Sequence, residues 1–307
     1  MIEDTFQKLK SNLELSPSFG DVVSRQHKAV RSVVENNAAS VKDTKLIGSL
    51  SRQTRIQPRD GDEFDIDILV LLGEFTSWQV TGGVTTTIAM NRVHGAVQSS
   101  DRYSKMNPEQ DHPTITFEYA NGVKVELVPA YLDKIGHAPN GNAHQPAGRA
   151  YWIPGRSGSW ELADYDYEAE YISAANKLSG GLLIPTVKML KAVKREHCPA
   201  LKSYHLEVIA ANVVPRLLAE YKEQGSNPTY PLLVADFLYR FDSQLTSMWG
   251  IPGSLSPPFV IDPVTRIAIS PNIAWLKEQA RSAWNDGTDA DKHRVWKTIF
   301  RDQLPLP

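Results

Sequence analysis

Cysteine is almost missing from this chain: among 307 residues there is one, Cys198. A single cysteine excludes an intrachain disulfide framework and any zinc knuckle built on several cysteines. Long apolar runs are missing too, because no stretch approaches the roughly 18 consecutive apolar residues of a membrane-spanning helix. The N-terminus also lacks a charged segment followed by an apolar one, the mark of a secretory signal. We therefore expect a soluble, cytoplasmic protein with no membrane partner.

An excess of positive charge is absent as well. Lysine and arginine total 33 against 35 acidic residues, which gives a formal net charge of −2. Proteins that bind long nucleic acid constitutively usually carry a clear positive excess, so we expect no long nucleic acid as a partner. The hydrophobic content of 41% and charged content of 22% are ordinary for a globular enzyme with an ample core.

The periodicity of apolar residues changes character near residue 165. The first part mixes helical and alternating patterns, and Asn121-Gly122 predicts a hairpin turn between strands at 114–119 and 123–128. Residues 133–162, rich in Gly, Pro, Asn and His, predict a long crossing loop. The later helical segments are 166–179, 182–197, 203–222, 231–248, 271–284 and 289–302. We predict an α+β protein with a mixed-sheet lobe at 1–164, including N-terminal helices, and a helical lobe at 165–307.

Two acids inside an apolar strand are the strongest chemical signal. Asp65 and Asp67 are two residues apart, so in a strand both carboxylates leave the same face. Such a pair repels by roughly 4 kcal/mol at an effective dielectric of about 20. A solvated edge strand is the plain alternative, but the run that follows is too apolar for it. A hard cation bound by oxygen ligands offsets the repulsion best.

The residues around this pair extend the pattern. Gly48-Ser49 ends a short apolar strand, and such a glycine lets backbone approach a phosphate. Glu126, near the end of the predicted hairpin, offers a third carboxylate. This set resembles the active site of polymerase-β-type nucleotidyltransferases, in which two strand acids hold two Mg²⁺ ions. The resemblance implies that Asp65 and Asp67 hold both ions, with Mn²⁺ as an alternative, and that Glu126 binds the ion that activates the attacking hydroxyl.

Other charged residues near these acids have two readings. Asp60, Asp62 and Glu63 fit solvated loop acids better than ligands. The arginines of the same loop, at positions 52, 55 and 59, either bind phosphate or pair with these acids.

A second group of polar residues opens the helical part. Lys191 lies on one predicted helix, and Ser203-Tyr204 begin the next. A helix N-terminus with a serine can hold an anion, a lysine supplies a point charge, and a tyrosine can stack on a base. A surface lysine, a serine N-cap and a half-buried tyrosine are the alternative.

Together these motifs resemble the bacterial cGAS/DncV-like nucleotidyltransferases, the cyclic-oligonucleotide synthases related to cyclic GMP-AMP synthase. The resemblance covers about residues 40 to 285. The matching pieces are Gly48-Ser49-x-x-Arg52-x-Thr54, Asp65-x-Asp67, Val125-Glu126-Leu127-Val128-Pro129-Ala130, Lys188-x-x-Lys191, Ser203-Tyr204-His205-x-Glu207, Val260-Ile261-Asp262-Pro263 and Pro271-Asn272-Ile273-Ala274.

This resemblance implies roles for single residues. Gly48 and Ser49 would hold the triphosphate, Lys191 and Ser203 would contact the donor phosphates, and Tyr204 would stack on a base. The metal roles of Asp65, Asp67 and Glu126 stay as above. The chain departs from the family at the third acid, which is usually Asp and is Glu126 here.

The implied activity is template-free joining of NTPs into a cyclic di- or trinucleotide second messenger, with release of pyrophosphate, in antiphage defence. The downstream effector would respond to the product, and a regulatory protein or phage-derived molecule would activate the enzyme. Linear oligonucleotide synthesis and a catalytically silent nucleotide-binding module remain alternatives. Trp152, Trp160 and loop 139–148 are candidates to line the acceptor side, with core packing as the plain alternative for each tryptophan.

Overall fold

The computed structural model describes residues 2–38, 40–75, 84–133, 150–285 and 287–306. Its helices are α1 (Ile2–Asn12), α2 (Pro17–Asn37), α3 (Gly48–Ser51), α5 (Thr86–Gln98), α6 (Tyr165–Leu178), α7 (Leu183–His197), α8 (Ser203–Glu223), α9 (Tyr230–Phe241), α10 (Pro263–Asn285) and α11 (Asp289–Phe300). Three short 3₁₀ turns are η1 (Ser104–Met106), η2 (Asp242–Gln244) and η3 (Arg301–Gln303).

The strands form one large mixed sheet and a small pair. They are β1 (Asp43–Leu46), β2 (Phe64–Phe75), β3 (Glu109–Asp111), β4 (Thr114–Glu118), β5 (Val123–Asp133), β6 (Tyr151–Pro154), β7 (Trp160–Ala163), β8 (Met248–Trp249) and β9 (Phe259–Val260). The order in the large sheet is β1-β2-β5-β4-β3, with β6 on β5 and β7 on β6. Only the β2–β5 pairing is parallel among the described strands, and it sets Asp65 beside Lys124 and Asp67 beside Glu126.

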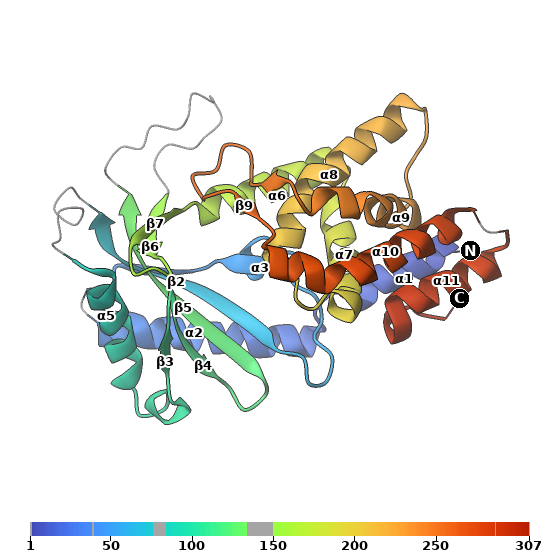
Figure 1. The fold of residues 1–307 in the computed structure, drawn as a ribbon. Coiled ribbons are helices and arrows are strands. Elements are labelled where there is room, and N and C mark those ends of the chain that lie inside the picture. The colour runs from blue at the N-terminus through green and yellow to red at the C-terminus, as the bar shows by residue number, and fades with distance from the viewer. Residues whose placement is uncertain (1, 39, 76–83, 134–149, 286, 307) are drawn as a thin grey trace.

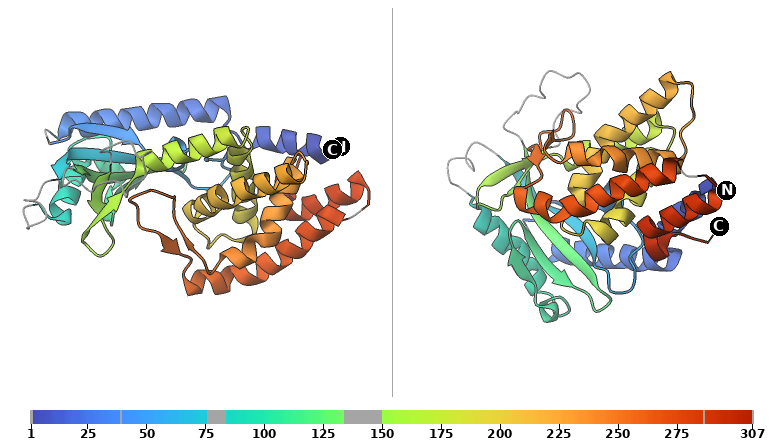
Figure 2. Two further views of the ribbon diagram at one scale, coloured as in Figure 1. Left: turned by 90° about the horizontal axis from the view of Figure 1, so that it is seen from above. Right: turned by 45° about the vertical axis from the view of Figure 1, so that its right-hand side comes forward.

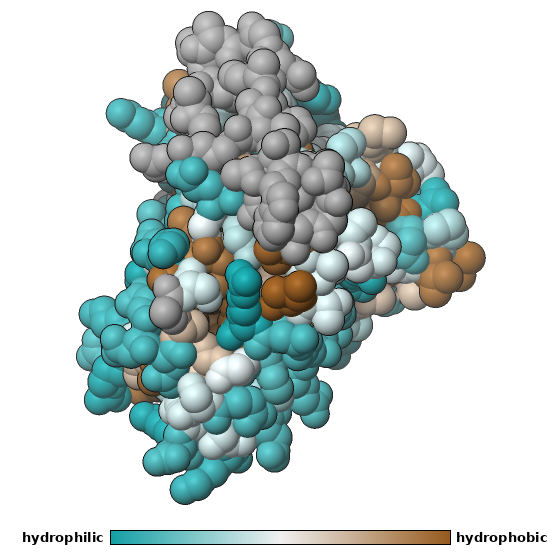
Figure 3. Space-filling model, turned by 90° about the vertical axis from the view of Figure 1, so that its left-hand side faces the viewer, coloured by the Kyte–Doolittle hydropathy of each residue, from teal (hydrophilic) through white to brown (hydrophobic). Residues whose placement is uncertain are grey.

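The alternation of β2 decides which face of the sheet is packed. Ile66 and Ile68 are fully buried in one core with side chains of α2 and α5, such as Val30 and Met90. These two helices cover that face of the sheet (Figure 1). Asp65 and Asp67 leave the opposite face, which looks toward the helical lobe. Viewed from the sheet end, the surface is mostly hydrophilic, with small scattered hydrophobic patches (Figure 3).

The helical lobe has its own core, built from α7 to α11 and from the N-terminal helix. Phe6 of α1 packs edge-on against Trp296 and Phe300 of α11, with ring centroids 4.9 and 5.6 Å apart. The two chain ends therefore lie together on this lobe, as the views in Figures 1 and 2 show. The α+β architecture with a sheet lobe and a helical lobe is confirmed.

The structure corrects two expectations about single segments. The predicted loop at 133–162 is wrong where it is described, because β6 and β7 form a hairpin there. Trp152 and Trp160 lie in these strands and pack on Phe75 at 4.8 and 5.3 Å, so aromatic packing overrides the turn-rich composition. Loop 139–148 lies outside the described residues. The helix expected at 271–284 begins earlier, at Pro263, since proline is well suited to a first helical turn.

A buried ion network joins the two lobes beside the acidic face. Glu207 of α8 is 1% exposed and accepts hydrogen bonds from Arg52 Nε at 2.8 Å and Thr54 Oγ1 at 2.7 Å. Its other oxygen accepts from Lys191 Nζ of α7 at 3.0 Å. These cations hold the pKa of Glu207 down at about 2, despite its burial. One carboxylate thus fixes the loop after α3 against two helices of the other lobe.

We predict that Glu207→Gln destabilises the protein by about 3–5 kcal/mol, because it leaves two buried cations without their acid. Urea unfolding measures the change. Glu220→Gln is the control, since Glu220 pairs with Arg240 at the surface. That substitution should cost no more than about 1 kcal/mol. Equal losses for both variants would contradict this role of Glu207.

Acid should weaken the same network. The folded pKa of Glu207 lies below its ordinary value of 4.5, so its contribution is complete above pH 4.5 and is lost as the pH falls toward 2. The stability difference between wild type and Glu207→Gln should therefore shrink as the pH falls through this range. A constant difference would show that the charge of Glu207 is not responsible.

Candidate active site

The turn after β1 brings backbone directly against the acidic face. Gly48 has a φ of +65°, and a Cβ built on it would lie 1.9 Å from Asp67 Oδ2. No other residue type fits this position without moving the carboxylate. The glycine therefore lets the first turn of α3, with Ser49, lie beside Asp67.

The two strand acids carry charge that the protein itself does not neutralise. Asp67 is half-buried, and neither its carboxylate nor that of Asp65 has a hydrogen bond or ion pair within the described part of the chain. Burial, together with Glu126 and Asp65, raises the pKa of Asp67 to about 7. Burial and Glu126 also raise the pKa of Asp65. Carboxylates held together in this way fit a hard divalent cation, which would lower the cost of ionising both.

Glu126 lies on the same face, in register with Asp67 on the parallel strand. Its Oε1 is 2.8 Å from Nζ of Lys124, two residues earlier on β5. Among the described residues, no three His, Cys, Asp or Glu side chains converge as ligands of one metal ion. The third acid is thus near the pair but engaged with a lysine.

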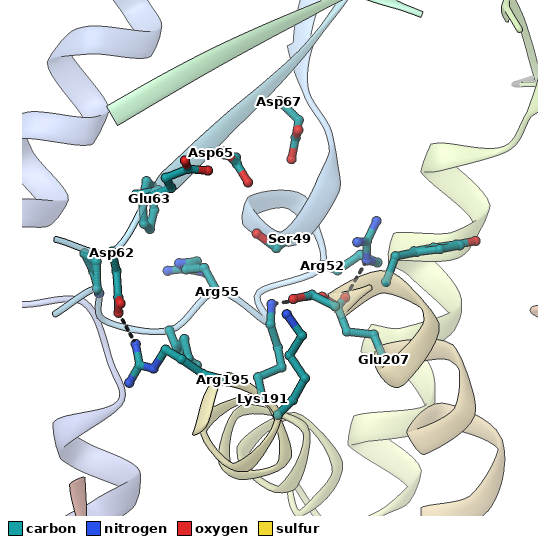
Figure 4. A pocket seen from close by; sticks show the side chains of 16 residues that line it. Ser49, Arg52, Arg55, Asp62, Glu63, Asp65, Asp67, Lys191, Arg195 and Glu207 are labelled. Carbon is teal, nitrogen blue, oxygen red and sulfur yellow. Dashed lines mark hydrogen bonds and ion pairs between the residues drawn. The ribbon is translucent and has the colours of Figure 1, made fainter. Parts of the chain in front are cut away.

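A cavity of about 450 Å³ opens between the acids and the helical lobe (Figure 4). Its floor is the N-terminal end of β2, and its opposite wall is α7 with the start of α8. The lining residues are Ser49, Arg52, Arg55, Ile56, Pro58, Asp62, Glu63, Phe64, Asp65, Asp67, Lys191, Lys194, Arg195, Ser203, Tyr204 and Glu207. Acidic and basic side chains therefore face each other across this cavity.

The structure separates the arginines that the sequence left undecided. Arg52 is buried and bound to Glu207, and Arg59, which does not line this cavity, pairs with Glu196 and Asp62. Arg55 has no hydrogen bond or ion pair among the described contacts, and its Nε is buried without a partner. In Figure 4 its side chain lies between the acids and α7. It is the arginine of the three whose charge remains available.

The lysines of α7 divide in the same way. Lys191 lines the cavity, but its Nζ already donates to Glu207 and to the carbonyl of Thr54, both at 3.0 Å. Lys194, one turn further on, lines the cavity with no ion pair in the described part of the chain, and burial lowers its pKa. Sequence reasoning missed Lys194. The spacing Lys188-x-x-Lys191-x-x-Lys194 could have revealed it, because residues three apart share a helix face.

The start of α8 is also at the cavity. Ser203 is the first residue of the helix and lines the wall. The Tyr204 hydroxyl donates to Glu168 at 3.1 Å, and the Arg52 guanidinium lies 5.1 Å over its ring. Tyr204 is thus held rigidly, with one ring face already covered by an arginine.

A second cavity, of about 620 Å³, lies on the other side of Asp67. It shares Arg52, Asp67 and Tyr204 with the first and has Glu126 in its wall. The β3–β4 turn, the β6–β7 hairpin and α6 form much of the rest, together with Ile47, Gly48, Val128, Ser256 and Pro257. Two spaces of nucleotide size therefore meet at one carboxylate.

Comparison with known proteins agrees with this geometry. Residues 1–148 match the family described as Second Messenger Oligonucleotide or Dinucleotide Synthetase domain. No curated protein matches the chain.

Solved structures match nearly the whole chain. Escherichia coli MS115-1 CdnC with ATP has a TM-score of 0.64 at 17% identity, over 99% of both chains. Bradyrhizobium diazoefficiens CdnG with GTP, described as a CD-NTase, has a TM-score of 0.67 at 13% identity, over 98% of this chain and 95% of that one. The Vibrio cholerae di-nucleotide cyclase DncV has a TM-score of 0.70 at 12% identity, over 96% and 94%. The family match therefore covers residues 1–148, and the chain as a whole shares its fold with the CdnC, CdnG and DncV structures.

Proposed function

We propose that this protein joins nucleoside triphosphates, without a template, into a cyclic di- or trinucleotide second messenger and releases pyrophosphate. The observation that carries the proposal is the meeting of two cavities at Asp67, one of them faced by unpaired basic side chains. A cyclic product needs a donor triphosphate and an acceptor hydroxyl on opposite sides of the same acids. The match of residues 1–148 to the second-messenger synthetase family supports the same activity.

Divalent cations are the cofactor that this site fits, Mg²⁺ in the first place and Mn²⁺ as an alternative. Asp65 and Asp67 would hold the ions, and Glu126 would join Asp67 on the acceptor side. Bound there, the ions supply charge neutralisation and Lewis-acid activation of the hydroxyl. The chain supplies the fixed spacing: the β2–β5 register sets the three carboxylates on one face, and Gly48 lets backbone N–H groups approach the same point.

The first cavity would take the donor triphosphate. Arg55 and Lys194, which have no ion pair among the described residues, supply positive charge, and Ser49 and Ser203 supply hydroxyls. Lys191 would act mainly by holding Glu207, with a third ammonium proton left for a phosphate oxygen. These groups would orient the α-phosphorus toward Asp67.

The second cavity would take the acceptor nucleotide. Its hydroxyl would lie between Asp67 and Glu126, where the half-buried Asp67 can accept a hydrogen bond or a proton. Tyr204 is half-buried and borders both cavities, so its ring is placed to contact a base. After the first phosphodiester bond forms, the linear intermediate would reorient between the two cavities before the ring closes.

We also propose that a separate protein regulates the activity and that effectors respond to the product rather than to the enzyme. The support is the likeness to E. coli MS115-1 CdnC, which is known in a complex with HORMA-deltaN. That match has a TM-score of 0.63 at 17% identity over 99% of this chain. Antiphage signalling is the setting that such a messenger system fits.

The direct test incubates the protein with Mg²⁺ and labelled NTPs in all combinations, followed by phosphatase and mass spectrometry. We expect a phosphatase-resistant product, and a loss of at least about 100-fold in rate with Asp65→Asn, because metal binding is worth several kcal/mol. Asp60→Asn is the control, since Asp60 is an exposed loop acid. Products that phosphatase trims would instead establish linear synthesis. Bound NTP with no product would favour either an activator that the assay lacks or a silent module.

Substitution of the basic side chains Arg55 and Lys194 tests the proposed donor cavity. We expect Arg55→Gln and Lys194→Gln each to raise the KM for NTP by roughly tenfold or more, because each removes a hydrogen bond to a charged phosphate. Arg59→Gln is the matched control, since Arg59 is already paired with Glu196 and lies outside the cavity. Steady-state kinetics measure the effect. An equal rise in all three variants would mean that general charge, and not these contacts, sets the affinity.

A further inference from the structure

A lysine stands among the catalytic acids. The β2–β5 register puts Lys124 directly beside Asp65 and Glu126 directly beside Asp67. Residues two apart on a strand share a face, and neighbouring parallel strands are about 4.8 Å apart. All four charged side chains therefore leave one small area of the sheet. This placement is fixed by backbone pairing and does not depend on a single rotamer.

The lysine is engaged with the third acid. Lys124 Nζ lies 2.8 Å from Glu126 Oε1, and the side chains are 33% and 26% exposed. The hydrogen bond to Glu126 and the charges of Glu126, Asp65 and Glu63 raise the pKa of Lys124. One ammonium thus partly offsets three carboxylates that otherwise repel one another.

Two directions are open to the Glu126 carboxylate, one toward Lys124 and one toward an ion held beside Asp67. The lysine lies along its own strand, whereas Asp67 lies across the sheet, in register. A glutamate has one methylene more than an aspartate, so its carboxylate can swing between these directions. A carboxylate oxygen that accepts from an ammonium also offers fewer lone pairs to a cation. An ammonium and a divalent ion a few ångströms apart repel each other as well.

We propose that Lys124 is a built-in competitor of the metal at the third acid: it holds Glu126 when no ion is bound, and the acceptor-side ion must displace it. The inference rests on the proposed function for the identity of the ion. Lys124 is then a positioning residue that stabilises the metal-free protein and weakens metal binding. The acceptor-side ion would then bind more readily when nucleotide phosphates add their own negative charge.

The test compares Lys124→Met with the charge-preserving Lys124→Arg in nucleotide-free protein. Calorimetric titration with Mn²⁺ should show about tenfold tighter binding in Lys124→Met and a change of less than about threefold in Lys124→Arg. The melting temperature without metal should fall in Lys124→Met, because the acids lose their counter-charge. The two readouts move in opposite directions, which a merely structural role of Lys124 would not produce. Lys124→Gln replaces Lys124→Met if the latter does not fold.

A second background assigns the effect to Glu126. In the Glu126→Gln background, Lys124→Met should change the Mn²⁺ affinity by less than about twofold, because the carboxylate for which Lys124 and the ion compete is gone. Unchanged or weaker Mn²⁺ binding in Lys124→Met would overturn the proposal, as would an equal gain in the Glu126→Gln background or no Mn²⁺ binding in any variant. None of these measurements needs turnover. Absence of a nucleotide product would therefore count against the proposed function and leave the metal competition to be decided separately.

Discussion

Electrostatic repulsion on one face of the β2–β5 pair is the constraint on which the site depends. Three carboxylates, from Asp65, Asp67 and Glu126, leave adjacent parallel strands toward the helical lobe. The strands can hold them there because their other faces are anchored in a dry core through Ile66 and Ile68. The acids cannot relax by turning over, since a one-residue slip would bury them. The fold thus maintains a negative site that a bound cation would stabilise.

The basic side chains that lie opposite these acids fall into two groups. Glu207 takes up Arg52 and Lys191, so these cations hold the lobes together and place the turn after β1. Arg55 and Lys194 have no ion pair within the described part of the chain, and they face the acids across the first cavity. The basic side chains that pair with Glu207 stabilise the fold, whereas Arg55 and Lys194 remain available to a ligand. The same division gives a chain of net charge −2 a local concentration of positive charge.

The sequence was sufficient for features set by short-range patterns. Alternation around Asp65 and Asp67, and the Asn121-Gly122 turn, predicted the acidic strand and the β4–β5 hairpin. Other features depend on contacts between distant segments. The different fates of Arg52 and Arg55 are set by Glu207, more than 150 positions away in the chain. The β6–β7 hairpin is likewise held by rings on Phe75, which no local turn signal records.

The glutamate at the third position is better understood together with its strand than as a weakened aspartate. An aspartate at 126 would reach less far along β5, and Lys124 would then be left among Asp65 and Glu63 without its closest partner. Glutamate and lysine therefore form a pair that fits the sheet geometry. The departure from the usual aspartate keeps a carboxylate at this position, since Glu126 lies in register with Asp67. It adds a second stable position for the carboxylate, so that occupancy of the acceptor side depends on what charge arrives with the substrate.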